Sequence, residues 1–273
     1  MKEIKILGIP VKQINKKQLL GLIEEKINRR EKLHIVTVNP EILVSAQKEN
    51  EFKKILRQSF NIPDAVGIMW AGYYLSKTNG ASGLFGSLKK LFWLKWSLIL
   101  TPFWQKKFKI FPEKLSGSDI FWDILKLADK KRYKIMFLGA DEGVAQMVAN
   151  KMKIQFKNLK IVGAIPGSAK ESDDEMMQKI VNNAGPQVIF AAYGSPKQEY
   201  WIARNLPYFK NSLITIGVGG TFDFVAGKAK RAPKILRSLG LEWLWRLIQE
   251  PKKRFKRIIN AVFIFPWLVF RKH

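Results

Sequence analysis

The sequence predicts an α/β fold in which a mostly parallel sheet carries helices on both faces. From residue 133 onward, short apolar runs alternate with amphipathic stretches. Each apolar run ends in glycine or in polar residues. Strands that are apolar along their whole length are typical of parallel sheets, whose two faces are both buried. The chain is 47% hydrophobic, which is enough for a sizeable core.

The first sixty residues show a less regular pattern. Pro40 follows a strand end and suits the first turn of a helix. The segment 17–30 carries leucine and isoleucine at helical spacing. In order, we expect a strand or hairpin, a helix, a strand and two short helices, at Glu3–Val11, Lys17–Arg30, Leu33–Val38, Pro40–Gln47 and Glu51–Ser59. A short strand then ends at Pro63, directly before Asp64.

The second half alternates regularly. Strands are expected at Lys134–Gly139, Lys160–Ala164, Gln187–Tyr193 and Ser212–Val218. Helices are expected between them, at Glu142–Phe156, at Ser172–Asn183 with Ser172 as its cap, and at Lys197–Asn205. Together these elements predict a Rossmann-like domain over residues 1–226.

Composition excludes several kinds of chemistry. With no cysteine, disulfides, thiolate metal sites and a cysteine nucleophile are excluded. Two histidines, His34 and His273, count against a Ser-His-Asp triad or a multi-histidine metal site. His34 lies in an apolar run and is expected to be a locally satisfied strand residue. Neither Gly-x-Gly-x-x-Gly nor a P-loop motif occurs.

The net charge of +26 calls for an anionic partner, and it is concentrated in two regions. Residues 77–114 carry eight lysines against one acid, and residues 228–273 carry thirteen Lys and Arg against two. Within 77–112, tryptophan and phenylalanine lie among the lysines, a mixture typical of a membrane-interface segment. A helical hairpin packed on the core or on a partner is the competing interpretation. We expect an aromatic insertion at 77–112 that contacts a membrane.

Residues 227–273 predict a basic helical appendage, with a helix over Ala232–Glu250 and a basic run after Pro251. Its last apolar stretch suits an anionic membrane surface, and long apolar runs without a known binding module weaken a nucleic-acid interpretation. The opening residues carry charges rather than a signal peptide, and no apolar stretch reaches the ~20 residues of a spanning helix. We therefore expect a cytoplasmic protein attached peripherally to the inner face of the membrane.

Polar and glycine-rich residues follow the strand ends, which meet at one edge of a parallel sheet. They are Thr37 and Asn39, Asp64, Gly139–Gly143, Gly194–Glu199 and Gly217–Thr221. Backbone N–H groups at such turns suit a diphosphate. A single aspartate after proline is most often a turn residue, so Asp64 by itself is weak evidence for a site.

Taken together, these motifs resemble the WecG/TagA/CpsF family of bacterial glycosyltransferases (glycosyltransferase family 26). The resemblance covers nearly the whole chain. It rests on Thr37–Pro40, Pro63-Asp64, Gly117–Asp119, Gly194–Glu199, Trp201–Arg204, Gly217–Asp223, Lys230–Pro233, Gly240–Trp243, Arg246-Leu247 and Gln249–Pro251.

The resemblance implies an inverting, metal-independent transferase without a cofactor. It would move N-acetylmannosamine, or a related hexose or uronic acid, from a UDP donor to polyprenyl (undecaprenyl) diphosphate-linked N-acetylglucosamine, in cell-surface polysaccharide or teichoic acid biosynthesis. Asp64 matches the proposed general base. Substrate-binding positions are matched by Thr37, Asn39, Lys114, Gly194, Gln198, Gly219 and Gly220. Diphosphate-binding positions in a tail that closes over the site are matched by Arg231, Arg246, Lys253, Arg254, Lys256 and Arg257.

The chain departs from the family pattern at several positions. Ala65 replaces a glycine, which would be strained if that backbone required a positive φ. Lys114 replaces an arginine and loses bidentate phosphate geometry. The segment 77–112 is an insertion relative to the pattern. The sequence leaves open the identity of the sugar, a homo-oligomeric state, and the alternative of a non-catalytic basic protein that binds nucleic acid or anionic lipid.

Overall fold

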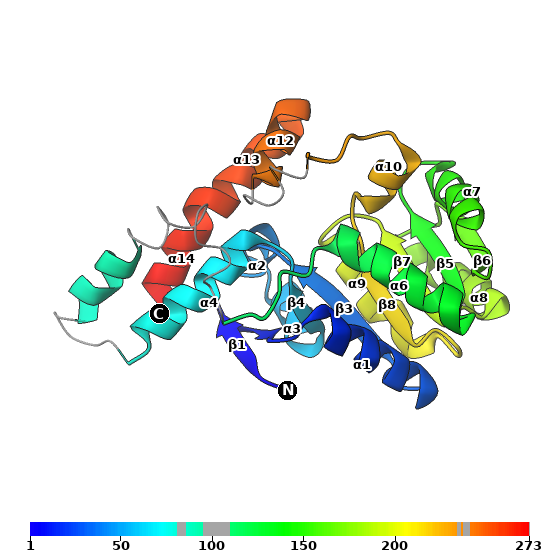
Figure 1. The fold of residues 1–273 in the computed structure, drawn as a ribbon, viewed down its shortest axis with the longest axis horizontal. Helices are drawn as coiled ribbons and strands as arrows, with labels where there is room; N and C mark the ends of the chain where they lie inside the picture. The colour runs from blue at the N-terminus through cyan, green and yellow to red at the C-terminus, as the bar shows by residue number, and fades with distance from the viewer. Residues whose placement is uncertain (81–85, 95–109, 234–235, 237–240, 273) are drawn as a thin grey trace.

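The computed structural model of the protein describes residues 1–80, 86–94, 110–233, 236 and 241–272 (Figure 1). Within these residues, the side chains of Arg246 and Lys253 are not described. None of the described helices is both long and apolar enough to cross a membrane.

The main sheet has six strands in the order β4-β3-β8-β7-β5-β6, and every neighbouring pair is parallel. The strands are β3 (Leu33–Val38), β4 (Phe60–Pro63), β5 (Lys134–Gly139), β6 (Lys160–Ile165), β7 (Val188–Ala192) and β8 (Ile214–Gly217). In the register of β3 with β4, Val38 lies opposite Pro63, so Asn39 and Asp64 leave the sheet side by side. The predicted α/β fold is confirmed.

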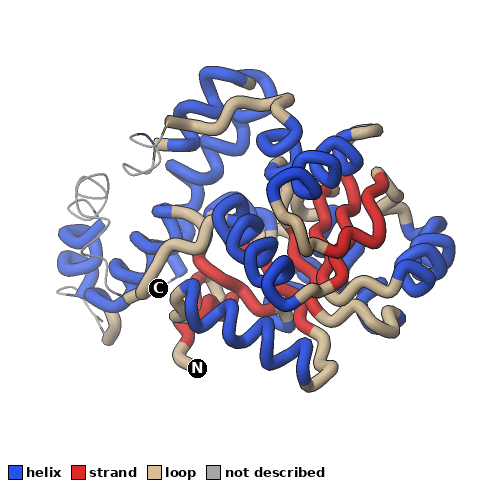
Figure 2. The backbone as a smooth tube through the Cα atoms, turned by 45° about the vertical axis from the view of Figure 1, so that its right-hand side comes forward, coloured by secondary structure: helices blue, strands red, loops and turns tan. Residues whose placement is uncertain are grey.

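Helices cover both faces of this sheet (Figure 2). On β5, Ile135 and Phe137 belong to one buried cluster, while Met136 and Leu138 belong to another on the opposite face. This alternation follows from the two-residue period of a strand. The first cluster is covered by α1 (Lys16–Asn28), α6 (Gly117–Lys131), α7 (Val144–Gln155) and α10 (Thr221–Ala226). The opposite face carries α8 (Asp174–Ala184), α9 (Lys197–Asn205) and the short η3 (Leu206–Tyr208). Beside α9 lies α3 (Asn50–Gln58), whose buried Phe52 and Leu56 belong to a further cluster.

A third cluster extends the fold beyond β4. It contains the antiparallel hairpin of β1 (Glu3–Ile6) and β2 (Ile9–Lys12), together with α2 (Pro40–Ser45) and α4 (Val66–Thr78). The C-terminal tail joins this cluster, because Phe265 and Val269 are buried in it. The chain therefore returns from α10 across the molecule to pack on α4 (Figure 1).

The tail consists of α12 (Glu242–Gln249), α13 (Pro251–Ile259), the π-helical turn η4 (Asn260–Ile264) and α14 (Phe265–Lys272). Pro266 stands just inside α14 and lacks the N–H that would bond to Val262. The π-helical turn that precedes it is one of the known ways in which a helix accommodates such an interruption.

Two local predictions differ from the structure. Ser172 does not cap an α-helix: it lies in the 3₁₀ turn η2 (Glu171–Asp173), and α8 begins only at Asp174. Of the helix expected over Ala232–Glu250, residues 232–233 are not helical, whereas Leu236 and α12 (Glu242–Gln249) are; residues 234–235 and 237–240 lie outside the described part of the chain. Of the insertion, residues 86–94 form a helix, whereas 81–85 and 95–109 lie outside the described residues.

Candidate active site

A cleft of about 520 Å³ lies at the carboxyl ends of β3, β4, β7 and β8. Its floor is formed by the residues that follow these strands and by the first turn of α6. Residues of α12, α13, η4 and α14 line its other side, so the tail forms a wall of the cleft. This is the edge of a parallel sheet at which ligands bind.

Asp64 lies on the floor, half-buried, directly after β4. Its backbone N–H donates to the carbonyl of Val38 at 3.0 Å, which continues the β3–β4 ladder by one residue. Its carboxylate Oδ1 accepts a hydrogen bond from the N–H of Gly117 at 3.3 Å, and this contact orients the side chain. Ala65 has a φ of −117°, so the alanine at this position is not strained.

Thr37 and Asn39 line the cleft beside Asp64. A Cβ placed on Gly117 would lie 3.3 Å from Oγ1 of Thr37, so this glycine allows α6 to start close to β3. Asn39 caps α2 through a hydrogen bond from the N–H of Ile42 to its Oδ1 at 3.0 Å. This cap leaves the amide nitrogen of Asn39 uncommitted to the helix.

Gln198 is held in a buried polar network. Its Oε1 accepts from the N–H of Gly219 at 3.2 Å, and its Nε2 donates to Oε1 of Glu199 at 2.9 Å. A Cβ on Gly217 would lie 2.3 Å from this Nε2, so only glycine leaves room for the network. Burial raises the pKa of Glu199, which is 1% exposed. Gln198 thereby fixes the loop after β8 at the cleft.

Three glycines are expected to bind substrate, and two of them have a positive φ, the backbone conformation that favours glycine. Gly194 and Gly219 have φ values of 78° and 49°, whereas Gly220 has an ordinary φ of −75°. All three line the cleft, as does Lys114. The structure therefore brings together all seven residues predicted to bind substrate, along with Asp64.

The six predicted diphosphate-binding cations are not all placed at the cleft. Arg254 and Arg257 line it: Arg254 pairs with Glu250, and Arg257 pairs with Glu41 of α2. Arg231 is not among the lining residues; its Nη2 donates to Oδ1 of Asp119 at 2.7 Å. Lys256 is exposed and does not line the cleft. The side chains of Arg246 and Lys253 are outside the described residues.

Several lining residues were not predicted as site residues. Ser118 and Thr221, whose hydroxyls are 3.3 Å apart, belong to motifs that the sequence analysis noted. Glu41 and Glu242 are two further carboxylates in the cleft. The apolar wall, in contrast, comes from residues that carry no motif: Trp70, Ile258, Ala261, Val262, Phe265 and Pro266.

Within the described part of the chain, no three His, Asp or Glu side chains come close enough to hold a metal ion. His34 is half-buried in β3, with its ring nitrogens turned inward, and its Nδ1 lies 3.0 Å from the hydroxyl of Ser59. Burial lowers its pKa to about 3, so the imidazole is neutral. The prediction of a locally satisfied strand residue is met at Nδ1, whereas the buried Nε2 has no hydrogen-bond partner among the described residues.

Comparisons with known proteins all match the chain to glycosyltransferases. A model of the glycosyl transferase WecG/TagA/CpsF family matches residues 4–83 and 98–273, so residues 84–97, inside the predicted insertion, fall outside the match. An N-acetylglucosaminyldiphosphoundecaprenol N-acetyl-beta-D-mannosaminyltransferase from Bacillus subtilis is 29% identical over 257 residues, which are 93% of this chain and 86% of that protein. A protein of the same name from Bacillus spizizenii is 27% identical over 227 residues, covering 83% and 74% respectively.

Proposed function

Because this chain belongs to the WecG/TagA/CpsF family of glycosyltransferases, we propose that it transfers N-acetylmannosamine, or a related hexose or uronic acid, from a UDP donor. The acceptor would be polyprenyl diphosphate-linked N-acetylglucosamine, the group that the names of its relatives contain. The observation that carries this proposal is the cleft itself. A carboxylate, Asp64, lies at the sheet edge, and two arginines, Arg254 and Arg257, lie on the tail side.

The reaction would proceed as one displacement. Asp64 takes the proton from the acceptor hydroxyl, whose oxygen then attacks the anomeric carbon of the donor sugar. The new C–O bond forms as the bond to UDP breaks on the opposite face, so the anomeric configuration inverts. The negative charge that develops on the departing UDP is stabilised by Arg254 and Arg257, with Lys114 as a further cation. In this scheme the cationic side chains stabilise the charge on the departing diphosphate, which in other transferases is stabilised by a metal ion.

Asp64 is the best candidate among the three acidic side chains that line the described part of the cleft. Glu41 lies on α2 and accepts from Nε of Arg257, one of the two arginines assigned to the departing UDP. Glu242 begins α12 and belongs to the tail rather than to the sheet edge. Asp64 alone of the three is placed by a strand end and oriented by the N–H of a helix start.

We also propose that the protein works at the inner face of the membrane, where a lipid-linked acceptor lies. The tail exposes large apolar side chains beside its cations: Ile248 is 70% exposed, Phe255 63% and Phe263 67%. The helix over 86–94 exposes Leu88 and Phe92, and it lies at the same end of the molecule as α14 (Figures 1 and 2). Apolar and cationic residues on one surface favour an anionic bilayer.

The test is a transfer assay with the full chain, UDP-N-acetylmannosamine and a soluble diphosphate-linked N-acetylglucosamine, with and without EDTA. We expect transfer with inversion and equal rates in both conditions. A panel of UDP-sugars against the same acceptor identifies the donor. Loss of the rate in EDTA would contradict the metal-free scheme. The absence of transfer from every donor, with retained lipid or nucleic-acid binding, would favour the non-catalytic alternative.

A further inference from the structure

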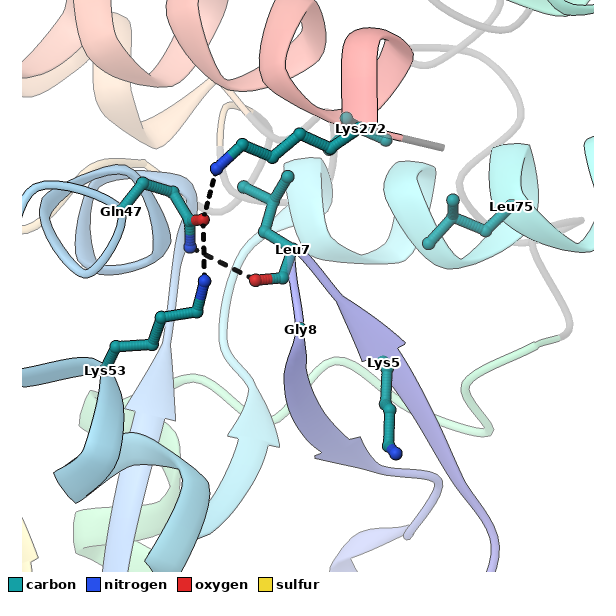
Figure 3. Close-up of a pocket in the computed structure, with 8 residues that line it drawn as sticks. Lys5, Leu7, Gly8, Gln47, Lys53, Leu75 and Lys272 are labelled. Carbon is teal, nitrogen blue, oxygen red and sulfur yellow. Dashed lines mark hydrogen bonds between the residues drawn. The ribbon is translucent and has the colours of Figure 1, made fainter. Parts of the chain in front are cut away.

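A second pocket lies between the β1–β2 hairpin and the end of the tail, and it shares no lining residue with the cleft (Figure 3). It encloses about 270 Å³. Its lining comes from the hairpin, the turn after α2, and the helices α3, α4 and α14: Lys5, Leu7, Gly8, Gln47, Lys53, Leu75, Val269 and Lys272. None of these lining residues is acidic, and three are lysines.

Two of the lysines converge on one amide oxygen. Nζ of Lys272 donates to Oε1 of Gln47 at 2.8 Å, and Nζ of Lys53 donates to the same atom at 3.1 Å. Figure 3 shows the two side chains reaching Gln47 from different elements, while Lys5 points away from them. A third cation is near, because Nε of Arg57 donates to the carbonyl of Gly8 at 3.2 Å. Burial, the charge of Lys272 and that of Arg57 lower the pKa of Lys53.

These cations lack a matching carboxylate. Among the described residues, no salt bridge involves Lys53, Arg57 or Lys272. The acidic side chains of the surrounding elements are engaged elsewhere or exposed: Glu3 pairs with Lys12, Glu49 accepts from the hydroxyl of Tyr200, and Glu51 is exposed. Lys53 is half-buried, whereas Arg57 and Lys272 are exposed. Positive charges held this close to one another favour the binding of an anion.

The opposite side of the pocket is apolar and already formed. Leu7, Leu75 and Val269 supply it. Leu7 has a φ of 53°, a conformation that residues other than glycine rarely adopt and that persists only where neighbours hold it. Here Nε2 of Gln47 donates to the carbonyl of Leu7 at 3.2 Å and fixes the hairpin tip. The pocket therefore suits a ligand that has both an anionic group and an apolar part.

We propose that this pocket binds a phosphate ester through Lys53 and Lys272. A phosphate carries up to two charges and three strong acceptor oxygens, so it can serve both ammonium groups at once, which the single oxygen of Gln47 cannot do equally well. Lys53 belongs to α3 and Lys272 to the end of α14, so the bound phosphate joins the tail to the domain. Binding here is separate from the reaction in the cleft.

The experiment is calorimetric titration of the full chain with two probes, inorganic phosphate and monomeric dihexanoyl phosphatidic acid. The variants are Lys53→Gln and Lys272→Gln, and the matched control is Lys54→Gln, which removes an exposed charge one residue away on the same helix. Each pocket variant should weaken binding about tenfold, the effect of one charge-assisted hydrogen bond, and the control should not. Phosphate held by Arg254 and Arg257 in the cleft would survive these changes, so only the component lost with Lys53 or Lys272 is scored.

The two probes separate the sources of the phosphate. Equal affinities identify a free phosphate ester, and tighter binding of the lipid identifies a lipid headgroup with its glycerol and chains against the apolar side. In either case, hydrogen exchange at the amides of 265–272 should slow when the ligand is bound. The proposal is overturned if neither probe shows a component sensitive to Lys53→Gln, or if Lys54→Gln weakens binding as much.

Discussion

Phe265 anchors the tail, and its replacement by alanine separates tail docking from the stability of the domain. The side chain is fully buried, and its ring meets that of Trp70 edge to face with centroids 6.1 Å apart. Truncating a buried phenylalanine to alanine costs about 3–5 kcal/mol. Because the tail is the last segment of the chain, this cost falls first on its docked state rather than on the sheet.

The expected change in tail docking follows from this cost. At about 1.4 kcal/mol per tenfold, the loss reduces the ratio of docked to undocked tail by about two to three and a half orders of magnitude. If the tail supplies the cations that stabilise the departing UDP, kcat/KM should fall steeply with a soluble acceptor. Hydrogen exchange over 265–272 should rise sharply, whereas β5 and β7 should stay protected.

The matched control is Phe263→Ala, which removes the same side chain two residues earlier, at a position that is 67% exposed. It should leave exchange and kcat/KM unchanged when the acceptor is soluble. Full activity of Phe265→Ala despite fast exchange over α14 would refute the idea that the docked tail completes the site. Unchanged exchange would show that Phe265 does not anchor it.

Three further predictions concern the charges and the polar network of the cleft. Arg257→Gln should lower kcat/KM about a hundredfold, because it removes a group that stabilises developing charge. Lys256→Gln, at an exposed position, should leave kcat/KM nearly unchanged, and equal losses in the two variants would contradict the role given to Arg257. Gly217→Ala should displace the side chain of Gln198 and lower kcat/KM about tenfold. The control, Gly21→Ala, lies in open space on α1 and should raise the free energy of unfolding in urea by about 0.5–1 kcal/mol. Full activity of Gly217→Ala would show that the hydrogen bonds of Gln198 are dispensable for transfer. The raised pKa of Glu199 means that the folded protein binds this proton more tightly than the unfolded chain does, so the contribution of Glu199 to stability should fall as pH rises above 4.5. Glu199→Gln should remove this part of the pH dependence in urea unfolding, and an unchanged pH dependence would contradict it.

Much of the sheet and of its edge could be predicted because both have local signals. Strand-length apolar runs predicted the strands, and the residues after them had to meet at one edge of a parallel sheet. Thr37, Asn39 and Asp64 are together for this reason. The lining of the tail side had no such signal, because Phe265 meets Trp70 although the two lie 195 positions apart in the sequence, and no local period encodes that contact.

The electrostatic details were also beyond local patterns. A run of basic residues after Pro251 does not reveal that Arg257 lines the cleft while Lys256 is exposed. Which of the two side chains reaches the cleft depends on how α13 is rotated about its axis where it packs beside α2. Arg231 lies in a motif shared with the family, yet its guanidinium pairs with Asp119 and is not among the residues that line the cleft. The role of each residue in catalysis remains a prediction.

The central claim is that Asp64 removes the proton from the acceptor, and the direct measurement is turnover by Asp64→Asn beside Glu242→Gln, a matched loss of a carboxylate in the same cleft. Transfer to the soluble acceptor should fall about 10²- to 10⁴-fold for Asp64→Asn, the usual contribution of a general base, with donor affinity and thermal unfolding unchanged. Glu242→Gln should retain most of the activity. An Asp64→Asn protein that turns over at the wild-type rate, with UDP-sugar binding intact, would contradict the mechanism.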